Sequence, residues 1–586
     1  MKDRKYRLVN KKYREFFWPA LAMAVANNIA VFVDSVLVSH FLGADKMPAI
    51  QLCYPMDAFV NMMYWMLGLG GSLLASNYIA DHEKEKADRV FSISIFTVTL
   101  FGLLVAVFGN LFLPQLSVIL CRDIGFRPYV IRYGRMMLVG MPFICFIMSI
   151  SYFARVDGSP NTGFYVVLVS NIVNLCMDVV LLKIVGMGLE GASLATVLGY
   201  CCGILYLLTY LRGSGRNMRF VNCFRGGGFF RELKLIVKKG IPTASSQLYM
   251  MIKAGVMNTM VLAYGGAVGI MTYAIYSNSL FLVSMIIIGT AQTLSPIVSV
   301  YAHEGDYDRA RYVLKRSIRT VLIGAVGLGI LFALFPMLVL LLYGIKDPAK
   351  VAECERAIRL YVLSYPALAF VYIMSYYFQA IGWEKLSTLI ILGEGLILPV
   401  AFVAVCAPLL SMNGIWLAII ATEVAASLLI LAGLYFAKHR NAALKDTSFL
   451  LPDASDPDKY EFTVSTNIKD AVTLSMEAQE WVSSRLDSKT AMKTCLALEE
   501  MLTGIVTASG EIEMMVDVVL RQEDHDIIIS IRDMSAGFNP TVEDNELELS
   551  FNNAAVLKKI ARDIKFDCSI GMNLTQIRIV QANQGG

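Results

Sequence analysis

The sequence predicts an all-α polytopic membrane protein with twelve transmembrane helices in two six-helix lobes, followed by a small cytoplasmic α/β sandwich domain. Of the 586 residues, 56% are hydrophobic and 17% are charged, whereas soluble domains carry about 25% charged residues. Residues 1–450 have a net charge of +15 and residues 451–586 have −11, so two physically different parts share the chain. Apolar stretches of about 20 residues, long enough to cross a hydrocarbon core of about 30 Å, follow one another in the first part only.

Apolar runs separated by polar residues define the twelve spans. They are centred near residues 28, 64, 102, 142, 173, 202, 250, 285, 326, 367, 397 and 425. The densest groups of Lys and Arg lie in the N-terminal tail, in 212–239 and in 309–319, all on one side of such a chain. Because cytoplasmic loops carry the excess of Lys and Arg, we expect both termini in the cytoplasm and the chain in the cell membrane. Nucleic-acid binding is not indicated, since lipid headgroups and membrane orientation account for these clusters.

The two halves of the membrane part resemble each other at a nearly constant spacing. Gly191–Ala195 parallels Gly414–Ala418 at an offset of 223, and blocks that begin at Ala80 and Met141 recur at offsets of 222 and 224. Six spans per repeat give both halves the same orientation, so an axis along the bilayer normal should relate them around a central cavity. The predicted boundaries are an N-lobe over 1–211, a connector over 212–239, a C-lobe over 240–440, a linker over 441–458 and a cytoplasmic domain over 459–586.

Two carboxylates lie well inside predicted spans, where an ionised carboxylate costs about 2.5 to 3.5 kcal/mol. They are Asp34 in the first span and Asp178 in the fifth, and Asn174 lies on the same helical face as Asp178. Carboxylate and amide oxygens suit a desolvated Na⁺, and two close carboxylates can instead share a proton. The alternative is that these groups only hydrogen-bond helices to one another.

The membrane part resembles the multidrug and toxin extrusion (MATE) antiporters over roughly residues 10–440. The stretches that carry the resemblance are Val33–Ala44, Asn174–Asp178 with Gly186–Ala192 after it, and Tyr377–Gly382. The resemblance implies a V-shaped transporter that exports amphipathic, often cationic compounds in exchange for Na⁺ or H⁺. It also implies which residues form the cation site in the N-lobe: Asp34, Asn174, Asp178 and Thr196. The helix hinge that it implies in the first span is Pro19, whose missing N–H weakens the helix.

Four further ionisable residues in the spans are candidates for charges in the cavity: Asp57, Lys253, Glu394 and Glu423. Lys253 either forms an ion pair with one of the glutamates or shapes the cavity charge and disfavours cationic substrates. Part of the MATE family has a carboxylate in span 7, where the charged residue of this sequence is Lys253. That departure favours the N-lobe as the coupling site.

The pattern changes after Tyr460 to mixed strand and helix periodicities, typical of an α/β sandwich. Strands are expected at 460–465, 512–521, 526–532 and 574–580, and helices at 468–485, 489–508 and 554–563. The stretches Leu498–Gly504, Ile531–Pro540 and Ile570–Asn573 resemble the ATPase domain of anti-sigma-factor serine kinases, a relative of histidine-kinase ATP-binding domains.

That resemblance implies a degenerate nucleotide pocket around Glu500, Asp533 and Gly537. Glu500 stands at the catalytic-base position and Asp533 at the position that recognises adenine. However, Gly504 replaces the Mg²⁺-binding asparagine, and Ser535 replaces the glycine expected two residues after Asp533. The glycine-rich lid is replaced by 550–554. Without these groups phosphate binding is weakened, so we expect no enzymatic activity and a domain that senses nucleotide or binds a regulatory protein. The alternative is a stabilising cytoplasmic appendage.

The favoured function is therefore a secondary antiporter that exports amphipathic drugs or toxins and needs no cofactor beyond Na⁺ or H⁺ as coupling ion. Its other expected partners are membrane lipid and a cytoplasmic regulatory protein. Two alternatives remain: a flippase for an amphipathic or lipid-linked metabolite, and a membrane sensor that signals through the C-terminal domain.

Overall fold

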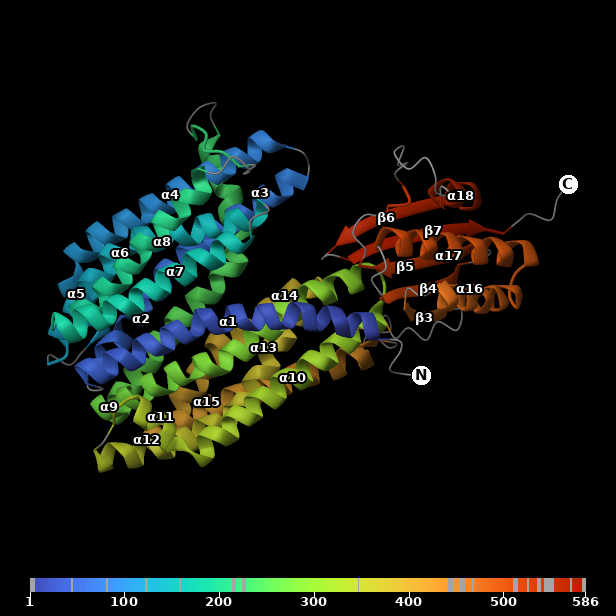
Figure 1. Cartoon of the computed structure of the whole chain (residues 1–586). Coiled ribbons are helices and arrows are strands. Elements are labelled where there is room, and N and C mark those ends of the chain that lie inside the picture. Colours follow the sequence, from blue (N-terminus) through green and yellow to red (C-terminus); the bar gives the residue numbers. More distant parts are fainter. Residues whose placement is uncertain are drawn as a thin grey trace. The chain divides into compact units, whose positions relative to one another are not determined.

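The computed structural model is mostly helical up to Arg440 and mixed beyond it (Figure 1). It describes residues 6–43, 46–80, 83–121, 125–157, 160–212, 218–223, 228–345, 347–440, 447–452, 459–465, 468–509, 515–523, 526–534, 539–541, 553–569 and 572–581. The chain divides into two compact units. The helical unit comprises Pro19–Gln292 and Ser317–Phe436, and the tail unit comprises Met1–Trp18, Thr293–Arg316 and Ala437–Gly586.

Long apolar helices make up the membrane part. Their bounds are α1 (Arg7–Leu42), α2 (Met47–Tyr64), α3 (Gly70–Ala80), α4 (Lys84–Leu111), α5 (Leu113–Leu120), α6 (Arg127–Val156), α7 (Pro160–Asp178), α8 (Leu189–Arg212), α9 (Phe229–His303), α10 (Tyr307–Leu334), α11 (Pro336–Leu342), α12 (Pro348–Tyr361), α13 (Tyr365–Ala380), α14 (Glu384–Leu392) and α15 (Leu398–Arg440). Residues 229–239, assigned to the connector from the sequence, are the first three turns of α9, where the side chains of Glu232 and Ile236 are buried.

Nine helices in the described residues are long and apolar enough to cross a membrane. Two of these segments have 59 and 56 residues, and at 1.5 Å per residue each is far longer than the roughly 30 Å core. Each contains one residue with left-handed backbone, Gly266 (φ 57°) in α9 and Ser411 (φ 54°) in α15. Two crossings in each of these segments give eleven, and α1 would be the twelfth. The predicted all-α membrane part is thus confirmed, and its count of twelve spans stays a prediction.

Close helix contacts in the helical unit depend on glycine. Gly240 in α9 lies so near the residues around Met66 that an added Cβ would be 2.0 Å from the Met66 carbonyl oxygen, and an added Cβ on Gly70 would be 2.6 Å from the Cα of Gly240. Small residues allow such backbone approach between membrane helices. The position of α9 against α3 therefore depends on these two glycines.

We expect Gly240→Ala to destabilise the protein by about 1 to 3 kcal/mol, because the methyl group overlaps a backbone atom that cannot rotate away. The measurement is the midpoint of thermal unfolding in detergent. Gly255→Ala in the same helix is the matched control, since no heavy atom lies within 4 Å of its added Cβ. Equal midpoints for the two variants would contradict the expectation.

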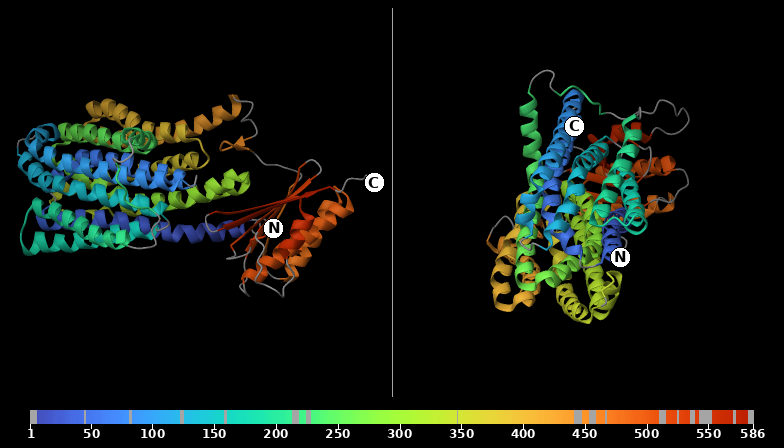
Figure 2. Two further views of the ribbon diagram at one scale, coloured as in Figure 1. Left: turned by 90° about the horizontal axis from the view of Figure 1, so that it is seen from above. Right: turned by 90° about the vertical axis from the view of Figure 1, so that its left-hand side faces the viewer.

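The C-terminal part of the tail unit is a five-stranded antiparallel sheet with helices on one face (Figure 2). The strand order is β3-β4-β5-β7-β6, and the bounds are β3 (Lys459–Ser465), β4 (Met515–Glu523), β5 (Asp526–Asp533), β6 (Asp563–Ser569) and β7 (Met572–Val580). The helices are α16 (Ile468–Ser483), α17 (Ser488–Ser509) and α18 (Asn553–Ile560), and a short hairpin, β1 (Thr447–Ser448) with β2 (Leu451–Pro452), precedes the sheet. The α/β architecture agrees with the sequence, but β6 was not predicted.

Alternation along the strands gives this sheet two different faces. Val518, Ile529 and Ile577 belong to the buried cluster that includes α16 and α17, and they define the helix face. The alternate residues of the strands point the other way, and they include Asp517 and Arg532, which are directly opposite each other on β4 and β5. We call this second surface the open face.

Candidate functional site

Asp34 and Asp178, the carboxyl groups predicted to form the coupling site, meet in the helical unit. Asp34 lies in the C-terminal part of α1, and Asp178 is the last residue of α7. Their side chains interact directly, and Asp178 is fully buried. Two ionised carboxylates this close repel each other, so the pair favours binding of a proton or a cation.

Asn174 and Thr196 complete this cluster. The Nδ2 atom of Asn174 lies 3.3 Å from Asp178 Oδ2 and 3.3 Å from Thr196 Oγ1, and it donates to both. The Oδ1 atoms of Asp34 and Asp178 are buried and accept no hydrogen bond from the described residues. Two hard oxygen ligands are thus open to a proton or to Na⁺. The structure brings the four predicted residues together, and their role in coupling stays a prediction.

The helical hydrogen-bond pattern changes beside this cluster. A π-helical segment, η3 (Val179–Ile184), follows Asp178 directly. A second π-helical segment, η5 (Gly393–Ile397), contains Glu394 in the C-lobe. Such segments are frequent at functional sites, because an extra residue per turn re-aims the neighbouring side chains. The sequence reading missed both segments, since α and π helices have nearly the same apolar pattern.

Lys253 forms an ion pair with Glu394, one of the two arrangements expected for it. Lys253 Nζ lies 3.2 Å from Glu394 Oε1, and Glu423 of α15 shares a side-chain hydrogen bond with Glu394. Both glutamates are buried, and Glu423 Oε2 accepts no hydrogen bond from the described residues. The fourth predicted cavity charge, Asp57, accepts a hydrogen bond from Asn61 one turn further along α2, at 3.1 Å.

The two ionisable clusters occupy corresponding spans of the repeat. Asp34, Asp178 and Thr196 lie in spans 1, 5 and 6, and Lys253, Glu394 and Glu423 lie in spans 7, 11 and 12. Each lobe therefore places one member of its cluster on each of its first, fifth and sixth helices. The repeat offset aligns these spans, so the correspondence of the two clusters could have been predicted from the sequence. It was not, because the C-lobe residues were considered individually.

Pro19 lies inside α1 and is exposed. The division between the two compact units falls between Trp18 and Pro19. Since proline supplies no N–H, the helix has one hydrogen bond fewer at this point. Its function as a hinge remains a prediction.

Comparison with known proteins shows which family the chain belongs to. The MatE family model matches residues 19–180 and 242–405, which together make up more than half of the chain. The two matches begin 223 residues apart, which is the offset of the internal repeat. The chain belongs to the MatE family. It is thus a multi-pass membrane transporter, and the first MatE match contains Asp34, Asn174 and Asp178, while the second contains Lys253 and Glu394.

Several proteins similar to this MatE chain are named as multidrug resistance or export proteins. The "Probable multidrug resistance protein YoeA" of Bacillus subtilis is 25% identical over 440 residues, which cover 72% of this chain and 92% of that protein. The "Multidrug export protein MepA" of Staphylococcus haemolyticus is 24% identical over 422 residues, 70% of this chain and 90% of that protein. A solved structure described as the inward-facing conformation of a multidrug resistance MATE family transporter aligns with a TM-score of 0.64 at 20% identity, covering 73% of this chain and 99% of that one.

The predicted nucleotide pocket lies beyond the two MatE matches. Asp533, at the end of β5, is buried on the helix face and accepts a hydrogen bond from Asn573 Nδ2 at 3.0 Å. Burial raises the pKa of Glu500 on α17, and the neighbouring Glu499 raises it further. Gly537 lies outside the described residues. The structure therefore places Asp533 and Glu500 on the helix side of the sheet, and nucleotide binding stays a prediction.

Proposed function

We propose that this MatE chain is a secondary antiporter of the cell membrane that exports amphipathic, cationic drugs in exchange for Na⁺ or H⁺. The family membership supports a transporter, and the names of the relatives YoeA and MepA support drug export. The observation that carries the coupling mechanism is the direct contact between Asp34 and Asp178, with Asn174 and Thr196 hydrogen-bonded beside them.

The proposed mechanism is a change in the charge of this pair. With one proton, Asp34 and Asp178 carry a single negative charge; without it, two carboxylates face each other and repel. A second proton, or Na⁺ held by the free carboxylate oxygens and the Thr196 hydroxyl, neutralises the remaining charge. The ion therefore favours a different arrangement of α1 and α7 from the empty site, and differential binding of this kind shifts a two-state equilibrium. Release of the substrate is coupled to this shift.

The test is dye transport by the full chain in inside-out vesicles, with an imposed Na⁺ gradient compared with an imposed pH gradient. Accumulation driven by one gradient supports an antiporter and names its ion. If neither gradient moves a cationic dye, the proposal fails. The ion pair between Lys253 and Glu394 leaves no uncompensated lysine charge to support the flippase alternative.

A further inference from the structure

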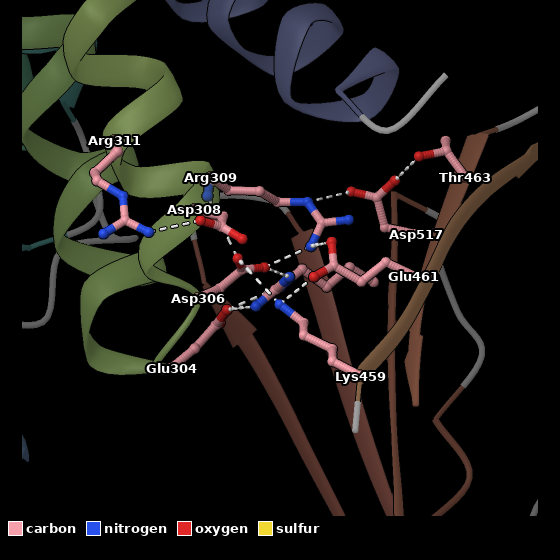
Figure 3. Close-up of polar contacts among 10 residues, drawn as sticks. Glu304, Asp306, Asp308, Arg309, Arg311, Lys459, Glu461, Thr463 and Asp517 are labelled. Carbon is pink, nitrogen blue, oxygen red and sulfur yellow. Dashed lines mark hydrogen bonds and ion pairs between the residues drawn. The ribbon is translucent and has the colours of Figure 1, made fainter. Parts of the chain in front are cut away.

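A buried network of ion pairs joins two distant parts of the sequence within the tail unit (Figure 3). One part is the docking loop, Glu304–Arg311, which connects α9 to α10 and includes the first turn of α10. The other is the open face of the C-terminal sheet. Arg532 Nε lies 2.8 Å from Glu304 Oε2, and Arg532 Nη1 lies 2.7 Å from Asp306 Oδ2. Arg309 Nε lies 3.2 Å from Asp517 Oδ2.

Burial of these charges is nearly complete. Arg309 has 0% of its surface exposed and Arg532 has 4%. Arg309 also donates to Asp306 Oδ2 at 2.6 Å, and Lys459 of β3 pairs with Asp306 at 3.9 Å. The guanidinium of Arg532 additionally lies 4.8 Å from the centre of the Tyr301 ring. Because removing one partner leaves an uncompensated buried charge, substitution of a single member should strongly weaken the contact between the loop and the sheet.

The two central carboxylates, Asp306 and Asp517, differ in how well neighbouring cations compensate their negative charge. Burial alone would raise the pKa of Asp306, but Arg309, Arg532 and Lys459 together hold that pKa far below its usual range. Burial raises the pKa of Asp517, and Arg309 and Thr463 offset this only in part. The charge of Asp306 is therefore the centre of the network, whereas the charge of Asp517 is poorly compensated.

The N-lobe carries an equivalent contact at the equivalent loop. At the repeat offset of 222, the docking loop corresponds to the loop before α4 and its first turn, with Arg89 in the place of Arg311. There the connector after α8 folds back, and the N–H of Arg219 donates to Asp88 Oδ1 at 2.8 Å. In the C-lobe the segment after α15 does the same, since Arg311 Nη1 donates to the Pro452 carbonyl at 2.7 Å.

In both lobes, then, the segment that follows the sixth span contacts the start of the third span. In the C-lobe this segment continues into the C-terminal domain, whose open face adds the contacts with the docking loop. This correspondence is independent of the charges in the network. It indicates that the start of the third span is an attachment point in each repeat.

We propose that the open face of the C-terminal sheet is a docking surface for the docking loop, and that the docked domain slows transport by holding this loop in one conformation. This inference rests on the proposed transport function. Transport requires the helices on both sides of the loop to alternate between two arrangements, and a contact made in only one of them stabilises that one. Arg532 and Asp533 are consecutive on β5 and point to opposite faces, so the strand that holds the loop also carries a residue of the predicted nucleotide pocket.

The test uses the full-length protein with Arg532→Gln, Glu304→Gln and the double variant. Hydrogen exchange of residues 304–311 reports docking, exchange of α17 reports folding of the domain, and dye transport in vesicles reports activity. The matched control is Arg578→Gln, since this arginine of the same sheet pairs with Asp526 but has 44% of its side chain exposed. Each single variant should speed exchange of the loop at least about tenfold, which corresponds to 1.4 kcal/mol. The double variant should add little to the effect of Arg532→Gln, because that substitution alone already removes the pair with Glu304.

The initial rate of dye transport should rise at least twofold in both single variants. In these variants α17 should remain protected from hydrogen exchange, and the Arg578→Gln control should keep the wild-type exchange and transport rates. Unchanged exchange of the loop would overturn the docking surface. Faster exchange with an equal or lower transport rate would overturn the slowing role. If the wild-type chain moves no dye while its loop is protected from exchange, the proposed transport function fails and the docking surface stands.

A second comparison separates the two carboxylates of the network. We expect Asp306→Asn to speed exchange of residues 304–311 at least about tenfold, since three cations lose their common partner. Asp517→Asn should change it less than threefold, because the amide can still accept from Thr463 and the charge lost was poorly compensated. Equal effects of the two substitutions would show that general destabilisation, not the network, is being measured.

Discussion

Asp34→Asn and Asp178→Asn are each expected to abolish gradient-driven dye transport. An asparagine can neither take up a proton nor supply a negative charge to Na⁺, so the pair loses one of its two charges and the repulsion that ion binding relieves. An ion contact worth about 2.7 kcal/mol corresponds to about a hundredfold loss. The measurement is the initial rate of dye accumulation in inside-out vesicles under the gradient that drives the wild-type protein.

The control for this experiment is Glu355→Gln. Glu355 pairs with Arg359 at 3.3 Å on α12, away from the predicted coupling residues in the sequence, and that arginine is largely exposed. Its pair contributes little, as is usual at surfaces, and the variant should transport at the wild-type rate. Wild-type rates in both aspartate variants would show that coupling uses other residues, with the cluster of Lys253, Glu394 and Glu423 as the next candidate.

Lys253→Met is expected to cost about 3 to 5 kcal/mol of stability, the usual effect of removing one partner of a buried ion pair. Glu394 is then left beside Glu423 without a cation, and both are buried. Adding Glu394→Gln should restore most of the loss, because one of the two carboxylates is removed. The measurement is the midpoint of thermal unfolding in detergent for the single and double variants.

Lys183→Met provides the comparison for a lysine outside such a cluster, since Lys183 lies in η3 on an exposed position. Its midpoint should stay within the range of surface substitutions, about 0.5 kcal/mol. A Lys253→Met variant as stable as the wild-type protein would contradict a stabilising ion pair between Lys253 and Glu394.

The sequence was sufficient for features with a local or periodic signal. Apolar length predicted the membrane helices, and the recurrence of Gly191–Ala195 at Gly414–Ala418 predicted the repeat. The grouping of Asp34 with Thr196 came from the family resemblance, because no local spacing links α1 to α8. Strand β6 was missed because Asp563–Ser569 mixes charged and apolar residues and follows a helix closely.

The docking network had no signal that one sequence can show. Arg309 was interpreted as one of several basic residues that orient the chain in the membrane. In the structure it is fully buried between Asp306 and Asp517. A contact between residues about 200 positions apart leaves no periodic pattern, so only the folded chain reveals that this arginine is different from its neighbours.

The wide separation of the network's members also sets an order of events during synthesis. The ribosome adds about 5 to 20 residues per second, so Asp517 is made roughly 10 to 40 s after Arg309. In that interval Arg309 has no sheet to contact and remains hydrated. A nascent or truncated chain that ends before β4 therefore exposes a cation that the finished protein conceals, which distinguishes incomplete chains from complete ones.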